Sequence, residues 1–185
     1  ARRGVTNALL SADFPFGPLQ EGVDAAVAAA IRFVKEAGVD LIKLDGAADY
    51  PEAVEALTRA GIPVWAQFGL TPQTALVMGI PYENQAGDGA DVVAEMEDRM
   101  LSDALMLEKA GAVLLDFTNS GPVVGPKVVE AVNIPVIGGF GGGPWLDGRV
   151  RLAQAAVGYN VAALDREPTG YANVARTIHD ALAEC

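Results

Sequence analysis

The chain has 185 residues, of which 51% are hydrophobic and 20% charged, a composition typical of one globular domain and not of a disordered chain. The formal net charge of −11 argues against nucleic-acid or anionic-membrane partners. No apolar run approaches the roughly 18 to 20 residues of a membrane helix, and no signal-peptide core follows the first arginines. The only cysteine is Cys185. We therefore expect a cytoplasmic protein, with no membrane partner and no intrachain disulfide.

Hydrophobic periodicity, with glycine and proline as breaks, predicts strands that alternate with helices along the chain. The expected strands are 6–13, 41–45, 63–68, 113–117 and 135–139. The expected helices are 21–37, 51–60, 92–110, 123–132 and 171–184. Residues 71–91 read as a loop-rich insertion, and 148–155 as the start of a helix more than as a sixth strand. Near-continuous apolar strands between amphipathic helices predict a parallel sheet covered by helices.

An internal repeat supports this interpretation: AGVDLIKLDG, AGIPVWAQFG, AGAVLLDFTN and VNIPVIGGFG each join a helix end to a strand. Polar residues recur where these strands end, and the carboxyl ends of parallel strands meet along one edge. We therefore expect five side chains to converge there: Asp13, Lys43, Asp45, Gln67 and Asp116. The pattern leaves two architectures open. One is an open doubly wound sheet, and the other is a (β/α)8 barrel lacking its N-terminal part, since a full barrel takes about 250 residues.

Four of these residues are candidates for chemistry, each with a structural alternative. Asp13 is a possible Mg²⁺ ligand or a turn aspartate that caps backbone amides. Lys43 and Asp45 lie on one side of their strand and form either an ion pair or a site that holds a substrate carboxylate beside a metal. Asp116 is a possible general base, with Thr118 on the same face, or a cap for the following loop.

Other motifs point away from familiar sites. The run Gly138–Gly143 lacks the Lys-Ser/Thr ending of a phosphate-binding loop, and close backbone packing explains its glycines equally well. His179, the only histidine, is expected on the surface of the last helix, which disfavours zinc sites and histidine-based catalytic triads. Trp65 and Trp145 read as core or site-wall residues.

Five segments, SADFPFG, AGVDLIKLDG, GIPVWAQFGLTPQT, MLSDALMLEKAGAVLLDF and IPVIGGFGGGPWLDG, resemble in this order the ketopantoate hydroxymethyltransferase family. The resemblance runs from Arg2 to about Gly158. It implies a (β/α)8 TIM barrel of the phosphoenolpyruvate mutase and isocitrate lyase superfamily, which favours the barrel. The first two βα units would be absent, and residues 1–185 would form a single partial barrel domain. It also implies Mg²⁺, 5,10-methylenetetrahydrofolate as co-substrate, a 2-oxo acid as substrate and a homo-oligomer, typically a decamer.

The resemblance also assigns roles. Asp13 would bind Mg²⁺, Asp45 would stand where the family has a glutamate near the metal, and Lys43 would contact the 2-oxo acid. Gln67 takes the place of a histidine near the substrate and Thr118 that of the proton-removing glutamate, so both are expected to bind the substrate. Asp116, one step back on the same face, is the nearest carboxylate that can replace that base. The family's second metal aspartate and a substrate-binding serine would lie ahead of residue 1.

Asp45, Gln67 and Thr118 differ from the family's residues at the corresponding positions, and this leaves three hypotheses. The first is a Mg²⁺-dependent hydroxymethyltransferase that converts 3-methyl-2-oxobutanoate to ketopantoate for pantothenate biosynthesis, or a divergent relative. The second is a lyase of the same superfamily that cleaves a C–C bond of a 2-oxo acid without folate. The third is a non-catalytic homologue that acts as an assembly subunit.

Overall fold

The computed structural model describes residues 2–71, 77, 79, 96–138, 142–159 and 171–184. Its centre is a six-stranded parallel sheet whose spatial order follows the chain, β1-β2-β3-β4-β5-β6. The strands are β1 (Ser11–Asp13), β2 (Leu41–Leu44), β3 (Val64–Gly69), β4 (Leu114–Thr118), β5 (Val136–Gly138) and β6 (Gly148–Arg149). The helices that precede or connect them are η1 (Arg2–Gly4), α1 (Pro18–Glu21), α2 (Val23–Arg32), η2 (Phe33–Ala37), η3 (Ala47–Asp49), α3 (Pro51–Arg59), α5 (Glu97–Lys109) and α6 (Val124–Ala131).

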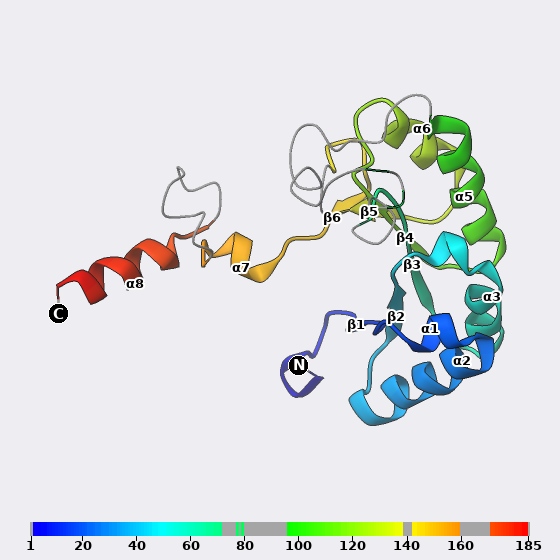
Figure 1. Cartoon of the computed structure of the whole chain (residues 1–185), viewed down its shortest axis with the longest axis horizontal. Helices are drawn as coiled ribbons and strands as arrows, with labels where there is room; N and C mark the ends of the chain where they lie inside the picture. Colours follow the sequence, from blue (N-terminus) through cyan, green and yellow to red (C-terminus); the bar gives the residue numbers. More distant parts are fainter. Residues whose placement is uncertain are drawn as a thin grey trace. The chain divides into compact units, whose positions relative to one another are not determined.

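Strand order decides between the two architectures that the sequence left open. A doubly wound sheet reverses its strand order near the middle, with helices on both faces. Here every strand pairs with its successor, and helices α1, α2, α3, α5 and α6 lie on one side of the sheet (Figure 1). This is the winding of a barrel, so the sheet is a curled half-barrel and the doubly wound alternative is wrong.

Side-chain alternation gives the sheet one apolar face and one polar face. The apolar face packs against the helices and forms the core, with burial of a large side chain contributing about 1.5–3 kcal/mol. Its strand residues are Ile42, Leu44, Val64, Ala66, Phe68, Leu115, Phe117 and Val136. Phe68 and Phe117 stack across β3 and β4 with ring centroids 4.5 Å apart. The other face is left to residues of the opposite parity, which include all the site candidates on the strands.

Most expected elements are present, and three differ. The helix expected at 21–37 is divided, because Gly22 adopts a φ of 122° between α1 and α2 and the last turn, η2, is π-helical. The strand expected at 6–13 is paired only over Ser11–Asp13. A sixth strand, Gly148–Arg149, occupies the place where the sequence suggested a helix start. The predicted insertion at 71–91 and the start of the helix at 92 lie largely outside the described residues.

Contacts divide the chain into two compact units, residues 1–149 and 150–185. The second unit contains α7 (Ala153–Ala156) and α8 (Val174–Ala183), which Asn173 caps by accepting a bond from the Arg176 amide at 3.0 Å. Backbone bonds from Tyr171 and Val174 to Ala156 and Val157 join its two parts. No helix in the described part of the chain is long and apolar enough to cross a bilayer. The expectation of a single domain over 1–185 stays a prediction.

Candidate functional site

The pairing of the strands places the site residues in two rows on the polar face of the sheet. Asp13 pairs with Lys43, and Lys43 with Trp65, across β1, β2 and β3. Closer to the carboxyl edge, Gln67 of β3 pairs with Asp116 of β4. Sequence reasoning placed these residues at strand ends. Gln67 and Asp116 instead lie within their strands, which the neighbouring strands flank on both sides.

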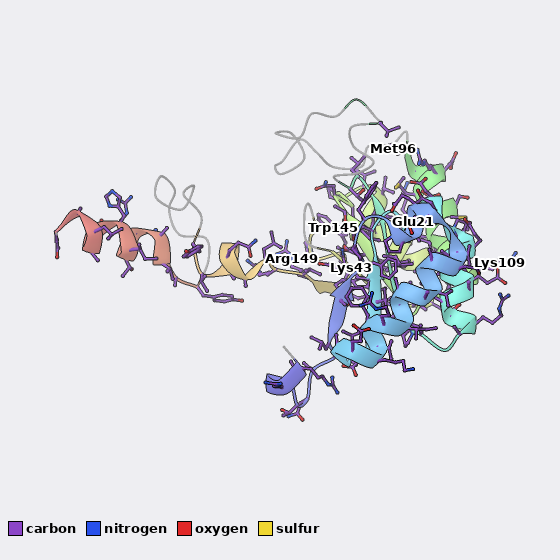
Figure 2. All side chains as sticks on the ribbon, turned by 60° about the horizontal axis from the view of Figure 1, so that its bottom comes forward. Glu21, Lys43, Met96, Lys109, Trp145 and Arg149 are labelled. Carbon is purple, nitrogen blue, oxygen red and sulfur yellow. The ribbon has the colours of Figure 1, made fainter. Side chains whose placement is uncertain are left out.

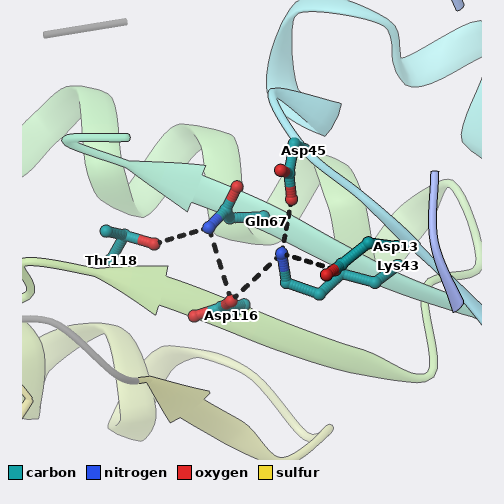
Figure 3. Close-up of polar contacts among 6 residues, drawn as sticks. All are labelled: Asp13, Lys43, Asp45, Gln67, Asp116 and Thr118. Atoms are coloured by element: carbon teal, nitrogen blue, oxygen red, sulfur yellow. Dashed lines mark hydrogen bonds and ion pairs between the residues drawn. The ribbon is translucent and has the colours of Figure 1, made fainter. Parts of the chain in front are cut away.

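A lysine ammonium lies at the centre of the site (Figure 3). Lys43 Nζ donates to Asp45 Oδ1 and lies 3.2 Å from Asp13 Oδ1 and 3.8 Å from Asp116 Oδ2. The same ammonium lies 5.7 Å from the centre of the Trp65 ring, within range of a cation–π contact. Only 12% of the Lys43 side chain is exposed, whereas Lys109 ends α5 on the helical side of the sheet (Figure 2). Lys43 is therefore enclosed by carboxylates.

A second, buried chain of contacts joins Asp116 to the end of β4. Gln67 Nε2 donates to Thr118 Oγ1 at 2.9 Å and lies 3.4 Å from Asp116 Oδ2. All three side chains are almost fully buried. Through Asp116, this group connects to Lys43, so the six predicted residues form one network (Figure 3). Their convergence is confirmed, while their roles stay predictions.

Burial sets the protonation of the two central groups. Burial raises the pKa of Asp116 to about 6, a rise that the positive charge of Lys43 partly offsets and the charges of Asp45 and Asp13 reinforce. For Lys43, burial works to lower the pKa, but the hydrogen bond and charge of Asp45, with the charges of Asp116 and Asp13, leave it raised. At neutral pH Lys43 is thus a cation, and Asp116 is a carboxylate that accepts a proton more readily than an ordinary aspartate.

The loop after β4 is held in an unusual conformation beside this network. Asn119 has a positive φ of 56°, and its buried amide donates to the carbonyl of Leu70 at 2.9 Å. Ser120 accepts a bond from Trp145 Nε1 at 2.9 Å. The Trp145 indole leaves no room for a Cβ at Gly125 or Gly143, each of which would come within 2.4 Å of the ring. The Leu70 amide also donates to the Thr118 carbonyl at 3.1 Å, so a backbone bond holds the end of β4 against the residue that follows β3.

Two residues beside the network were not among the predicted site residues. Trp65, which the sequence placed in the core or the site wall, has its ring centre 5.7 Å from the Lys43 ammonium, and its alternation with Gln67 along one strand is the signal that could have placed it on this face. Asn119 was not predicted either, although asparagine after a strand is among the few non-glycine residues that commonly adopt a positive φ. Gly138 lies where a Cβ would meet the Phe117 carbonyl at 2.7 Å, which supports the packing explanation of that glycine. Gly139–Gly141 lie outside the described residues. His179 is exposed and lies 3.0 Å from Asp180, as expected for a surface residue.

A metal site is only partly formed by these side chains. Among the described residues, no group of three or more histidine, cysteine, aspartate or glutamate side chains is placed to hold a metal ion. Asp13 and Asp45 nevertheless direct carboxylate oxygens at one point, where the Lys43 ammonium now provides the positive charge. Mg²⁺ needs only one or two carboxylates with water and substrate oxygens, so the donor chemistry fits this ion.

A curled parallel sheet with helices on one side and a charged network on its polar face defines a barrel-type α/β protein. A solved structure supports this class: a protein described as a phosphonomutase from Burkholderia cenocepacia J2315 superposes with a TM-score of 0.52. It is 16% identical, and the match covers 97% of this chain and 72% of that one. At this identity the likeness shows the fold alone.

The sequence comparisons identify the family. The family model described as ketopantoate hydroxymethyltransferase matches residues 1–184. The 3-methyl-2-oxobutanoate hydroxymethyltransferase of Geobacillus thermodenitrificans is 36% identical, over 98% of this chain and 63% of its own length. That of Cyanothece sp. is 37% identical, over 98% of this chain and 67% of its own length. The chain belongs to the ketopantoate hydroxymethyltransferase family, and it spans slightly less than two thirds of several curated relatives.

Proposed function

We propose that this chain carries the enolising half of a hydroxymethyltransferase site for a 2-oxo acid. The single observation that supports this most is Asp116, a buried carboxylate with a raised pKa beside a lysine cation. Its Oδ1 atom is buried and accepts no hydrogen bond. A base that must take a proton from carbon needs a free lone pair and a pKa near the working pH. Asp116 meets both requirements.

The other residues take roles that their contacts support. Lys43 provides a fixed positive charge for the carboxylate of the 2-oxo acid and for the oxygen on which enolate charge develops. Asp116 Oδ1 receives the proton from the carbon next to the carbonyl. Gln67 orients Asp116 through its amide, and Thr118 anchors that amide. Thr118 itself has no titratable group to act as the base.

Mg²⁺ is part of the proposal. Asp13 and Asp45 would hold it, and when bound it polarises the keto oxygen as a Lewis acid. The Asp13 side chain is 77% exposed, so it is free to turn toward an incoming ion. The one-carbon donor in the proposal is 5,10-methylenetetrahydrofolate, as the family resemblance implies, and the product from 3-methyl-2-oxobutanoate is ketopantoate, for pantothenate biosynthesis.

The finer architecture belongs to the same proposal. The half-barrel would be part of a (β/α)8 barrel of the phosphoenolpyruvate mutase and isocitrate lyase superfamily, with two βα units outside residues 1–185. These residues would then belong to a single domain that assembles as a homo-oligomer. The sequential strand order supports this completion, because a half-barrel closes by adding further strands at its edges.

The test is hydrogen exchange at carbon. The protein is incubated with 3-methyl-2-oxobutanoate in D₂O, with and without Mg²⁺, and the C3 proton is followed by NMR. We expect Mg²⁺-dependent loss of the signal, which Asp116→Asn abolishes. Asp103→Asn is the matched control: Asp103 is an aspartate of α5 with a pKa raised by burial, paired with Arg99 outside the site.

The outcomes separate the three hypotheses. Exchange followed by folate-dependent product formation supports the transferase. Exchange with C–C cleavage in the absence of folate supports a lyase. No exchange above the buffer rate with any 2-oxo acid contradicts the enzymatic proposal and favours a non-catalytic subunit.

A further inference from the structure

Four buried polar atoms in the described part of the chain lack a hydrogen-bond partner, and all four belong to the polar face of the sheet. They are Ser11 Oγ, Trp65 Nε1, Gln67 Oε1 and Asp116 Oδ1. Register places their residues on one face, because Asp13 pairs with Lys43, Lys43 with Trp65, and Gln67 with Asp116. Buried polar groups are normally satisfied, so these atoms are the ones for which a bound ligand or water must supply the missing bonds.

The chemistry of these atoms constrains that ligand. Gln67 Oε1 and ionised Asp116 Oδ1 only accept hydrogen bonds, and the Ser11 hydroxyl can also accept. Trp65 Nε1 only donates. If Asp116 Oδ1 is reserved for the proton taken from carbon, Gln67 Oε1 still needs a donor. A 2-oxo acid with a purely hydrocarbon chain has none to offer.

The charge of Asp116 sets the orientation of the Gln67 amide. In the present orientation Nε2 donates to Thr118 and lies beside Asp116 Oδ2. Rotation by 180° would keep a bond to Thr118, whose hydroxyl can donate as well as accept, but would turn the amide oxygen toward the ionised Asp116 carboxylate. The unpartnered oxygen therefore stays within the site, next to the carboxylate that acts on the substrate.

We propose that Gln67 is a specificity-determining residue whose amide oxygen accepts a hydrogen bond from a substrate hydroxyl, so that the site selects hydroxylated 2-oxo acids over hydrocarbon ones. This rests on the proposed function, because it assumes that a 2-oxo acid binds beside Lys43 and Asp116. It also narrows that function, because a preference for hydroxylated substrates makes the chain a divergent relative for which the hydrocarbon 3-methyl-2-oxobutanoate is a weak substrate. The hydroxyl belongs on or near the reacting carbon, since Gln67 is the direct strand neighbour of Asp116.

A matched pair of ligands tests this without turnover. Hydroxypyruvate and 2-oxobutanoate have the same number of heavy atoms and differ by a hydroxyl in place of a methyl group on C3. Binding of each is measured by calorimetry in the presence of Mg²⁺. We expect hydroxypyruvate to bind roughly tenfold to a hundredfold more tightly, the range for leaving a buried acceptor unpaired.

Variants then assign the effect to Gln67. Gln67→Met keeps the length of the side chain but removes the acceptor, and should reduce the preference to within about threefold by weakening hydroxypyruvate alone. Gln154→Met, at an exposed glutamine of α7, should leave the preference unchanged. The wild-type ratio is informative even if Gln67→Met fails to fold.

The results distinguish the two proposals. Equal binding of the pair, or tighter binding of 2-oxobutanoate, overturns the selectivity while leaving the proposed function intact, and water would then satisfy Gln67. A preference that survives Gln67→Met overturns the assignment to this residue. If neither ligand binds, nor 3-methyl-2-oxobutanoate, the 2-oxo acid site itself is rejected, and the selectivity with it.

Discussion

At the scale of single residues, the protein keeps an ionisable carboxylate almost fully buried. The Asp116 side chain is 6% exposed, and Lys43 Nζ, at 3.8 Å, is the cation that offsets part of the desolvation. The arrangement resembles that of general acids and bases whose carboxyl groups have a raised pKa, because burial shifts that pKa toward the working pH. It has consequences for both rate and stability.

The exchange rate should follow the ionisation of Asp116. Because only the carboxylate can take a proton from carbon, we expect Mg²⁺-dependent exchange to rise with pH and reach a plateau above the pKa of about 6. The measurement is the exchange rate of 3-methyl-2-oxobutanoate between pH 4.5 and about pH 8, corrected for buffer catalysis. A rate that is independent of pH across this interval would remove Asp116 from the role of base.

Stability should move in the opposite direction. The pKa of Asp116 in the folded state, about 6, lies above its ordinary value of 3.8. The folded state therefore binds this proton more tightly than the unfolded state, and that contribution to stability is lost as pH rises from 3.8 through about 6. At pH 7.5 the buried charge therefore costs stability, and Asp116→Asn should stabilise the protein by about 1–3 kcal/mol, with little gain at pH 4.

Urea unfolding at the two pH values measures this difference. Glu55→Gln, an exposed glutamate of α3, changes the net charge by the same amount and controls for general repulsion. If both variants gain equally at pH 7.5, burial of Asp116 is not the cause. The expected outcome, a more stable protein that no longer exchanges protons, is the usual trade between stability and activity.

Magnesium should bind the folded chain in the absence of substrate. Binding to the native state alone raises stability by about 2.7 kcal/mol at a hundred times the dissociation constant. We expect MgCl₂ to raise the melting temperature more than NaCl at equal ionic strength, and the double variant Asp13→Asn, Asp45→Asn to lose that difference. Asp24→Asn, at an exposed aspartate of α2, should retain it. An equal response in the double variant would place the ion elsewhere.

At the scale of elements, the ends of β3 and β4 touch more closely than any side chain permits. Gly69 ends β3 with a φ of 96°, and a Cβ there would lie 2.4 Å from the Thr118 carbonyl oxygen. Gly61, between α3 and β3, has a similar φ of 81° but nothing within 4 Å of its Cβ position. A substitution at Gly61 therefore tests backbone strain alone, whereas one at Gly69 tests strain together with steric overlap.

Alanine at these two glycines should therefore have unequal effects. Gly61→Ala costs about 1 kcal/mol from the positive φ alone, whereas Gly69→Ala should cost about 3 kcal/mol or more because backbone atoms must also move. Denaturant unfolding gives both values. Equal costs would show that the strand ends can separate without penalty, and Thr118 would then not be held as described.

The elements that the sequence predicted are those marked by a recurring pattern, either alternation along a strand or glycine at the end of a helix. Alternation along Ile42-Lys43-Leu44-Asp45 correctly separated core from site, and a glycine marked three of the helix-to-strand joints, at Gly38, Gly61 and Gly111. The two-residue strand β6 was not predicted, because Gly148–Arg149 is too short to show alternation. Its position is fixed instead by a backbone bond from the Asp147 amide to the Val136 carbonyl at 2.9 Å. The break at Gly22 was missed because apolar periodicity continues across it.

The site was predictable in its members but not in its contacts. Parallel strands bring the residues of successive strand ends together, so Asp13, Lys43 and Asp45 followed from topology. The pairing of Gln67 with Asp116 depends on register, and the internal repeat is one residue out here, because it aligns Gln67 with Phe117. Alternation can place Trp65 on this face, but the unpartnered amide oxygen of Gln67 cannot be inferred from residue types.

At the scale of the whole molecule, the charges of the candidate site are only a small part of a large negative excess. The network around Lys43 gathers three carboxylates about one cation, while the chain as a whole carries −11. Repulsion between like charges destabilises a compact state and is screened over about 10 Å at 0.1 M salt.

Moderate salt should therefore stabilise the protein. We expect the melting temperature to rise as NaCl increases from about 20 to about 300 mM, because screening relieves repulsion among the excess carboxylates. Potassium chloride should act alike, which excludes a specific sodium site. A melting temperature that falls with salt would mean that ion pairs such as Lys127–Glu97, 2.6 Å apart, outweigh the net repulsion.

The two faces of the sheet also bear on how this protein can change over evolutionary time. Residues that pack against the helices have one parity along each strand, and residues of the candidate site have the other. Substitutions at Asp45, Gln67 or Thr118 can therefore alter the chemistry without changing the side chains that pack the sheet against the helices. A library randomised at only these positions should yield mostly folded variants, from which new substrate preferences could be selected.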